Sequence, residues 1–279
     1  MNQPVVSVIV PTFNSSASLA ACLQSIHDQS YENIELIVVD NNSRDNTKEI
    51  AQRYTQKVFN CGPERSAQRN FGVAKSVGVY VAIIDSDMEL TGDVVKSCVM
   101  EIQRDPAIQG MVIPEESFGE GWWARCKKLE RSFYVGVDWM EAARFFRKHA
   151  YERAGGYNEN MVSGEDWDLS QRIGRLGKIG RIDDYIRHNE GKISLLKTIR
   201  KKYYYAQDFA RYVNLNQGEK KLAKQTGIIS RYGLFFSNPR RLFRDPFLGL
   251  GMLFMKTCEF GVGGAGYLIG KLGAHEKHT

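Results

Sequence analysis

Two aspartates, separated by a single residue, follow a short apolar segment in the N-terminal half of the chain. Residues 80–84 are apolar and include β-branched side chains, and Asp85 and Asp87 come after them. The apolar run predicts a buried strand of a parallel sheet, and ligands of open α/β sheets bind beyond the carboxyl ends of the strands. Mg²⁺ and Mn²⁺ prefer oxygen ligands and share their coordination with substrate phosphates, so both carboxylates are candidate metal ligands. Taken alone, the pair fits a solvated turn better, and the choice depends on the rest of the chain.

A second group of acids stands at the predicted start of a helix. Glu165, Asp166 and Asp168 come just before Leu169 and Ile173, whose spacing predicts the buried face of that helix. The helix dipole favours acids in the first turn, which accounts for one or two of the three. Adjacent carboxylates also raise one another's proton affinity, which suits a general base.

Alternating strands and helices must position these acids. Apolar runs at residues 5–12, 34–40, 57–60 and 80–85 alternate with helical patterns, which predicts a parallel sheet with right-handed crossovers. Polar side chains follow several of these strands, namely Thr12, Asn14, Asp40, Asp85 and Asp87. A nucleotide bound at this edge would find Asp40 for its base or ribose, and a metal would neutralise its diphosphate.

Four motifs occur in the order typical of one enzyme family. They are VIVPTFN (residues 8–14), IVVDNNS (37–43), RNFG (69–72) and IIDSD (83–87). Together they resemble the family 2 glycosyltransferases of the GT-A fold. The resemblance covers about residues 5–190 and implies an α/β fold, a Rossmann-like mixed and mostly parallel sheet flanked by helices.

The resemblance also implies a role for individual residues. The D-x-D motif, Asp85-Ser86-Asp87, binds a divalent metal (Mg²⁺ or Mn²⁺) and the diphosphate of the sugar nucleotide, with Asp85 and Asp87 as the metal ligands. Asp40 contacts the nucleobase. The residues that line the nucleotide pocket are Pro11, Thr12, Asn14 and Arg69.

The catalytic base of the family lies in a G-E-D segment, which places it on Asp166 with Glu165 beside it. His188 has two alternative interpretations, one structural and one functional. A lone histidine is usually structural, whereas in several GT-A enzymes a histidine after this helix reaches the metal or the diphosphate.

The composition is that of a folded protein of a reducing compartment. Hydrophobic residues make up 43% and charged residues 25% of the 279 residues, and the five cysteines are scattered without a metal-binding or disulfide pattern. The chain enters a predicted strand at once, so we expect no signal peptide. We expect two domains, a GT-A catalytic domain over 1–190 and a basic, apolar, helical region over 191–279.

The C-terminal region predicts contact with an anionic surface. Residues 192–244 hold thirteen Lys and Arg residues against two acids, whereas the whole chain has a net charge of only +6. Residues 246–270 are largely apolar but contain Lys256 and Glu259. Amphipathic helices on an anionic membrane fit this pattern best, and a true membrane span or a helical hairpin in the core remain open. We expect the protein in the cytoplasm, at the cytoplasmic face of the membrane.

The sequence therefore predicts an inverting, metal-dependent glycosyltransferase. Its partners would be a nucleotide sugar donor, with a UDP-sugar favoured, a lipid-linked or membrane-proximal glycan acceptor, and an anionic membrane surface; we expect no nucleic acid. The alternative is a basic binding protein with the same fold and without turnover, which would bind anionic lipid or nucleic acid. That alternative leaves Asp85, Asp87 and Asp166 unexplained.

Overall fold

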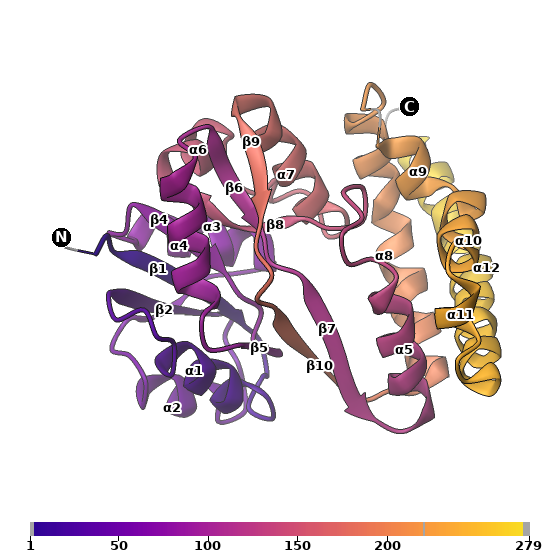
Figure 1. Ribbon diagram of the computed structural model, residues 1–279, viewed down its shortest axis with the longest axis horizontal. Coiled ribbons are helices and arrows are strands. Elements are labelled where there is room, and N and C mark those ends of the chain that lie inside the picture. Colours follow the sequence, from indigo (N-terminus) through magenta and orange to yellow (C-terminus); the bar gives the residue numbers. More distant parts are fainter. Residues whose placement is uncertain (1–2, 220, 276–279) are drawn as a thin grey trace. The chain divides into compact units, whose positions relative to one another are not determined.

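A seven-stranded sheet organises the first of two compact units in the computed structural model, which describes residues 3–219 and 221–275 (Figure 1). We call this part the sheet unit. Its central strands are β1 (Val6–Thr12), β2 (Ile34–Asp40), β3 (Val58–Asn60), β4 (Tyr80–Ile83), β6 (Ile108–Val112), β8 (Ala143–Arg147) and β9 (Lys178–Arg181). They pair in the order β3-β2-β1-β4-β8-β6-β9. Only β8 runs antiparallel to its neighbours, so the predicted mixed and mostly parallel sheet is confirmed.

Helices cover both faces of this sheet. The helices of the sheet unit are α1 (Leu19–His27), α2 (Thr47–Gln52), α3 (Arg65–Lys75), α4 (Val94–Arg104), α6 (Lys148–Arg153) and α7 (Glu165–Leu176). The alternation of side chains along β1 divides the core, since Val8 and Val10 pack with α1 and α4 whereas Ile9 packs with α3, α6 and α7. All seven residues of β1 are buried, as expected for a parallel strand covered on both faces.

Gly72 sets the distance between α3 and the sheet. A Cβ atom at this position would lie 2.5 Å from Cγ2 of Ile9, so only glycine allows α3 to approach β1 this closely. Arg69 lies three residues earlier on the same helix and is fully buried. The close approach at Gly72 therefore helps to bring Arg69 down toward the sheet.

The strand register brings the predicted polar residues to one edge. Thr12 lies opposite Asp40 across β1 and β2, and Ile9 lies opposite Ile83 across β1 and β4. Asp85 follows β4 by two residues, level with the end of β1. The carboxyl ends of β2, β1 and β4 are thus adjacent, as the sequence predicts.

A small second sheet carries His188 to the D-x-D motif. Its strands are β5 (Met88–Leu90), β7 (Glu115–Glu120) and β10 (Ile186–Lys192), in the order β5-β10-β7. His188 pairs with Met88 in the antiparallel register of β10 and β5, and the backbone N–H of Asn189 donates to the Asp87 carbonyl at 2.7 Å. Residues a hundred positions apart in the chain therefore become neighbours.

The second compact unit is helical and includes more than the C-terminal region. It comprises residues 116–141, 161–164 and those from 190 onward, and we call it the helical unit. Its helices are α5 (Trp122–Ser132), α8 (Leu195–Leu215), α9 (Leu222–Thr226), α10 (Ile228–Phe236), α11 (Pro239–Leu242) and α12 (Pro246–His275). The predicted boundary at 190 coincides with one edge of this unit, but α5 groups with the C-terminal helices. Whether 1–190 folds alone stays a prediction, and residues 220 and 276–279 of the predicted C-terminal region lie outside the described residues.

Four charged side chains are buried together where α5 meets α12. Lys256 Nζ contacts Glu130 Oε1 at 2.9 Å and Glu259 Oε2 at 2.6 Å, and Lys127 Nζ contacts Glu130 Oε2 at 2.9 Å. The pKa of Glu130 lies well below its ordinary value, because Lys127 and Lys256 outweigh the effect of its burial. Lys256 and Glu259, the two charges of the apolar C-terminal segment, thus face the protein. Among the described residues, none of the helices combines the length and the apolar character that a membrane span requires.

We expect the substitution Lys256→Met to destabilise the protein by about 3–5 kcal/mol, because it leaves buried carboxylates with too few cations. Urea denaturation followed by circular dichroism measures this loss. The double variant Lys256→Met/Glu259→Met keeps the Lys127–Glu130 pair and removes one charge of each sign. It should therefore be more stable than the single variant, and an equal or larger loss in the double variant would contradict the electrostatic explanation.

Candidate active site

Arg69 of α3 joins three carboxylates that are far apart in the sequence. Its Nη2 donates to Asp85 Oδ1 at 2.7 Å, and its Nη1 donates to Asp166 Oδ1 at 3.1 Å and to Glu165 Oε1 at 3.4 Å. The Arg69 side chain has no exposed surface. A buried guanidinium needs such partners, because an unpaired buried charge is very costly. One side chain therefore connects the D-x-D motif to the acidic start of α7.

The neighbour of Arg69 in the sequence fixes the loop that supports it. Asn70 Oδ1 accepts hydrogen bonds from the backbone N–H of Tyr157 at 2.8 Å and from the Tyr151 hydroxyl at 2.6 Å. The ring of Tyr157 lies 4.7 Å from the guanidinium carbon of Arg69, in the geometry of a cation–π contact. The Arg-Asn pair thus has two roles, with Arg69 in the site and Asn70 in its support.

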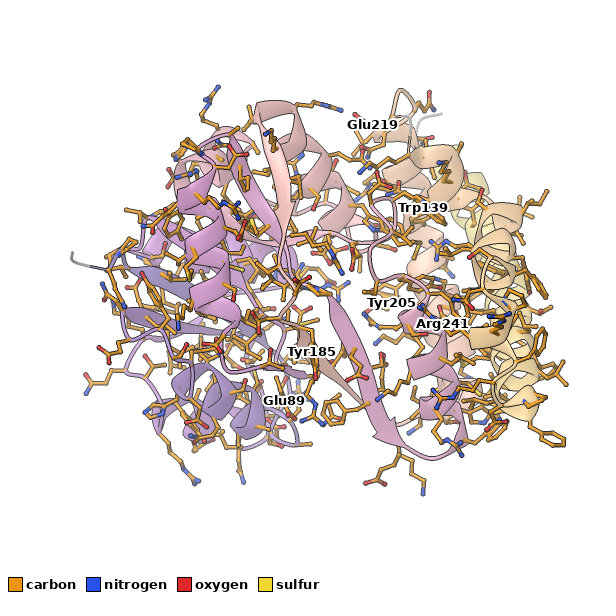
Figure 2. All side chains as sticks on the ribbon, viewed as in Figure 1. Glu89, Trp139, Tyr185, Tyr205, Glu219 and Arg241 are labelled. Atoms are coloured by element: carbon orange, nitrogen blue, oxygen red, sulfur yellow. The ribbon has the colours of Figure 1, made fainter. Side chains whose placement is uncertain are left out.

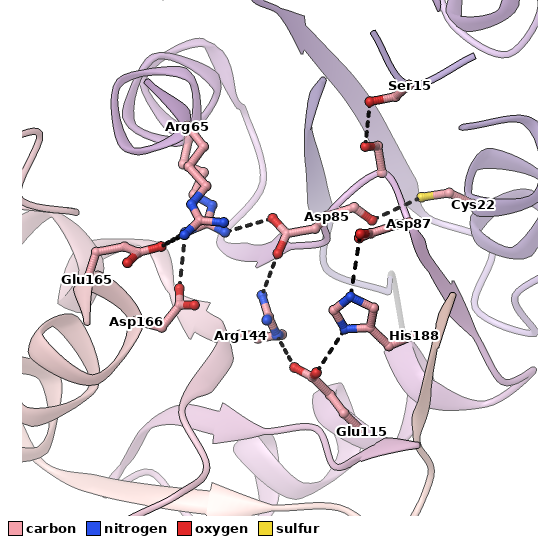
Figure 3. A network of polar contacts seen from close by, with 12 residues as sticks. Ser15, Cys22, Arg65, Asp85, Asp87, Glu115, Arg144, Glu165, Asp166 and His188 are labelled. Atoms are coloured by element: carbon pink, nitrogen blue, oxygen red, sulfur yellow. Dashed lines mark hydrogen bonds and ion pairs between the residues drawn. The ribbon is translucent and has the colours of Figure 1, made fainter. Parts of the chain in front are cut away.

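Arg144 and Glu115 continue the network toward His188. Arg144 Nη1 lies 3.4 Å from Asp85 Oδ2, and its Nε donates to Glu115 Oε1 at 2.8 Å. Glu115 Oε2 lies 3.3 Å from Nδ1 of His188, whose Nε2 lies 3.4 Å from Asp87 Oδ2. Contacts between acidic and basic side chains therefore run without interruption from Asp166 to Asp87 (Figure 3).

Burial and neighbouring charge shift the pKa values of two carboxyl groups of this network in different directions. Burial by itself would raise the pKa of Asp85, but Arg69 and Arg144 outweigh it and hold that pKa well below its usual range. Burial, and then the adjacent charge of Asp166, raises the pKa of Glu165 above its ordinary value. Asp85 is therefore a permanent anion at neutral pH, whereas Glu165 binds a proton more readily than a free glutamate.

The exposed surface of the two adjacent acids differs. The Glu165 side chain is 3% exposed and pairs with Arg65 at 3.0 Å in addition to Arg69, whereas the Asp166 side chain is 28% exposed. Asp168 is also mostly buried and binds Arg172, which in turn donates to the carbonyl of Gly156. Of the three acids, Asp166 is the one best able to meet a substrate.

The residues after β1 and β2 form a tightly bonded loop pair. Asp40 is fully buried, and its carboxylate accepts hydrogen bonds from the Thr12 hydroxyl at 3.1 Å and from the Ser43 backbone N–H at 2.8 Å. Asn14 has a φ of 49° and accepts a hydrogen bond from the Arg44 N–H at 2.9 Å. Asp40, Thr12 and Asn14 therefore shape the loops at this edge of the sheet, together with Pro11 at the end of β1.

The D-x-D motif offers a hard cation one partly exposed carboxylate beside an imidazole. Among the described residues, no group of three or more His, Cys, Asp and Glu side chains is arranged to hold a metal ion. Both Asp85 oxygens contact arginines, while the half-exposed Asp87 carboxylate lies beside His188. Mg²⁺ is commonly held by one or two carboxylates with substrate phosphates completing its shell, so this donor set fits a cation shared with a diphosphate.

Residues 7–157 match the sequence profile of glycosyl transferase family 2, which is more than half of the chain. The protein belongs to this family. The predicted family is confirmed, and with it the prediction that the chain is a glycosyltransferase at the level of the family.

Relatives and solved structures agree with this assignment. The glycosyltransferase GlyA of Streptococcus pneumoniae is 27% identical over 237 residues, which are 81% of this chain and 31% of the relative. The chain thus spans about a third of the length of that relative. A Pyrobaculum calidifontis mannosyltransferase, solved with GDP-Man and Mn²⁺, matches with a TM-score of 0.63 at 17% identity over 96% of this chain and 88% of its own. TarS 1–349 of S. aureus, solved with UDP-GlcNAc, matches with a TM-score of 0.52 at 17% identity over 96% and 92% of the two chains. The predicted GT-A fold is confirmed.

The family 2 motifs converge only in part. One network contains Arg69, Asp85, Glu165 and Asp166, and Asp87 contacts His188. The carboxylate of Asp40 instead accepts a hydrogen bond from the loop that follows β2. Ser86 bonds to Ser15 at 2.8 Å, so it ties the motif to the loop after β1. Four residues of this network were not predicted from the sequence, namely Arg65, Glu115, Arg144 and Tyr157. One signal for Arg144 was present, since it is a charged residue within the buried strand β8.

Proposed function

We propose that the protein is an inverting, metal-dependent glycosyltransferase that moves a sugar from a nucleotide sugar to a glycan acceptor. The observation that carries this proposal is the fully buried Arg69, which binds Asp85 and Asp166 at once. Donor and acceptor must meet within bonding distance for transfer. Because the Arg69 guanidinium contacts both Asp85 and Asp166, it sets the distance between the carboxylate on the proposed donor side and the carboxylate on the proposed acceptor side.

Asp166 is the proposed general base. It would accept the proton of the acceptor hydroxyl as that oxygen attacks the anomeric carbon on the face opposite the diphosphate. Its partial exposure lets it reach an acceptor, and Arg69 fixes its orientation. Glu165 is then a positioning residue, because its buried carboxylate holds Arg65 and Arg69.

The donor side is proposed to lie at Asp85, Ser86 and Asp87. Asp87, with His188, would hold Mg²⁺ or Mn²⁺, and the ion would supply positive charge to the leaving diphosphate. Arg144 holds Asp85 and Glu115, and Glu115 in turn orients the imidazole of His188. The proposal includes the roles that the family resemblance implies at the nucleotide. Asp40 would contact the nucleobase, and the nucleotide pocket would also be lined by Pro11, Thr12 and Asn14. Asp85 would be a second metal ligand.

The donor is proposed to be a UDP-sugar. Two proteins of similar fold were solved with nucleotide sugars, one with GDP-Man and Mn²⁺ and one with UDP-GlcNAc, which supports the class of donor and leaves the nucleotide to experiment. The acceptor is proposed to be a lipid-linked or membrane-proximal glycan. The protein would then work at the cytoplasmic face of a membrane.

A panel of UDP- and GDP-sugars tests this function. Release of the nucleoside diphosphate is measured with Mn²⁺, with Mg²⁺ and with EDTA, because slow hydrolysis of the donor does not require the acceptor. We expect one nucleotide to be preferred and EDTA to abolish the release. Tight binding without any turnover in the presence of metal and a glycan lipid acceptor would instead favour a binding protein.

Glu115 provides a prediction about the support of the metal site. We expect Glu115→Gln to weaken the apparent affinity for Mn²⁺ about 10–100-fold, because residues that orient a metal-binding histidine have effects of this size. Turnover measured against Mn²⁺ concentration gives the result, and saturating Mn²⁺ should restore most of the rate. Glu116→Gln is the matched control, since Glu116 forms an ion pair with Lys128 and should leave the Mn²⁺ dependence unchanged.

A further inference from the structure

Helix α12 has one charged face and one apolar face. Lys256 and Glu259 are buried with Lys127 and Glu130 of α5. Over residues 246–269, the part of the helix whose side chains are described, the exposed large side chains are all apolar, namely Phe247, Leu250, Phe254, Leu268 and Ile269. Phe247 is 77% exposed. The charges that weaken a membrane interpretation of the sequence are therefore absent from the exposed face of the described part of α12.

The apolar face runs along most of the helix. Phe247, Leu250, Phe254 and Leu268 recur at helical spacing, with the small exposed positions 257, 261 and 264–265 between them. From Phe247 to Leu268 the helix extends about 32 Å at 1.5 Å per residue. The opposite side packs closely on α8, where a Cβ at Gly266 would lie 2.6 Å from the Tyr203 carbonyl oxygen. Glycines thus hold α12 against its neighbours and leave one long face uncovered.

Further exposed apolar side chains lie in α10 and in the segment before α12. Phe243 lies beside the Gly249 position of α12, and its ring centre is 6.4 Å from that of Phe236 at the end of α10. Ile229, 88% exposed, lies two turns before Phe236 on the same side of α10. We call the set of Ile229, Phe236, Phe243, Phe247, Leu250, Phe254 and Leu268 the apolar face.

Exposed arginines lie close in the sequence to the start of α12. Arg240 lies within α11, and Arg244 follows the end of that helix by two residues. Both side chains are exposed. Arg241 of α11, labelled in Figure 2, is also exposed, and its side chain donates a hydrogen bond to the Ser132 carbonyl at 2.8 Å. Large exposed apolar surfaces mark binding sites, and cations beside them select an anionic partner.

We propose that the apolar face docks on the surface of a membrane rich in anionic phospholipid. Its Phe, Leu and Ile side chains would enter the interface, with α12 lying in the membrane plane, and Arg240 and Arg244 would bind headgroup phosphates. A second copy fits less well, because a two-fold contact through this face brings like-charged arginines together. The proposal does not depend on the proposed reaction, since binding is measured without donor or acceptor.

Co-sedimentation of the full chain with vesicles tests the proposal. The vesicles contain phosphatidylglycerol and phosphatidylcholine, or phosphatidylcholine alone, at low and high salt. We expect binding to the anionic vesicles only, weaker at high salt because screening acts on exposed charge. The variant Arg240→Gln/Arg244→Gln should bind on the order of 30-fold more weakly, since each arginine at a membrane surface contributes about fivefold. Phe247→Ser/Phe254→Ser should lose about tenfold or more.

Matched controls come from α4 in the sheet unit. Lys96→Gln/Arg104→Gln removes the same charge from exposed positions, and Met100→Ser removes an exposed apolar side chain. Both controls should bind as the wild type does, and circular dichroism should show that all variants are folded. Wild-type protein that stays in the supernatant with anionic vesicles at low salt would overturn the proposal. So would equal losses in the controls, or a dimer in solution that Phe247→Ser/Phe254→Ser converts to a monomer.

Discussion

The Asp166→Asn enzyme should bind its nucleotide sugar within a few-fold of the wild type and turn over about 10²–10⁴ times more slowly. A positioned general base contributes a factor of this size, and an amide cannot accept the proton. The amide oxygen can still accept a hydrogen bond from Arg69, which also keeps Asp85 and Glu165 as partners. The fold around Arg69 should therefore persist. Isothermal titration with the donor and steady-state kinetics with an acceptor separate binding from turnover.

Two neighbouring acids serve as controls for Asp166. Glu165→Gln should reduce the rate less, because the buried Glu165 pairs with Arg65 and Arg69 and is proposed to position them, not to accept the proton. Asp168→Asn should act mainly on stability through the loss of its pair with Arg172. A near-normal rate for Asp166→Asn beside an inactive Glu165→Gln or Asp168→Asn would move the base to another residue. Loss of donor binding in Asp166→Asn would mean that Asp166 contacts the sugar or supports the fold.

The second large effect is expected at the metal. Asp87→Asn should abolish turnover and strongly weaken metal-dependent donor binding, because a neutral amide replaces an anionic ligand of a hard cation poorly. Asp87 is the more available carboxylate of the motif, since Arg69 and Arg144 already hold Asp85. Donor titrations with Mn²⁺ and with EDTA measure the effect. The wild type should respond to Mn²⁺, and the variant should bind the donor equally weakly in both conditions.

Glu89→Gln is the matched control for Asp87→Asn. Glu89, labelled in Figure 2, lies two residues further along the chain, on β5, and forms an ion pair with Arg187 at 3.8 Å. Its loss removes the same charge from the same segment and should leave the Mn²⁺ response intact. Full activity of the wild type in EDTA, or of the Asp87→Asn enzyme with metal, would exclude the proposed metal role.

The residues of the strands and of the loops after β1 and β2 could be predicted from local patterns. Apolar runs predict β1, β2 and β4, because a strand buried on both faces needs apolar side chains at every position. Polar residues directly after such runs must lie at the sheet edge, since adjacent parallel strands end together. The positions of Thr12, Asp40 and Asp85 therefore followed from the sequence, and the register confirms their adjacency.

Partners distant in the chain were not readable in this way. Arg69 was predicted to line the nucleotide pocket, but its contacts to Asp85 and Asp166 join α3 to the end of β4 and the start of α7. Glu115 and Arg144 gave no spacing signal, because residues on different strands share no local period. The sequence likewise did not show that Lys256 and Glu259 face the protein, because this depends on the packing of α12 against α5.

By itself, then, the sequence determined the family, the elements of the sheet and the chemical types at its edge, because these depend on short-range patterns and ordered motifs. Only the tertiary structure decided which carboxylate is exposed and which is buried, and which face of α12 remains uncovered. Both depend on contacts between segments about a hundred or more residues apart, such as Arg69 with Asp166 and Lys256 with Glu130. Burial and pairing set the protonation and reach of an acid, and neither is encoded by the residue or its neighbours in the chain.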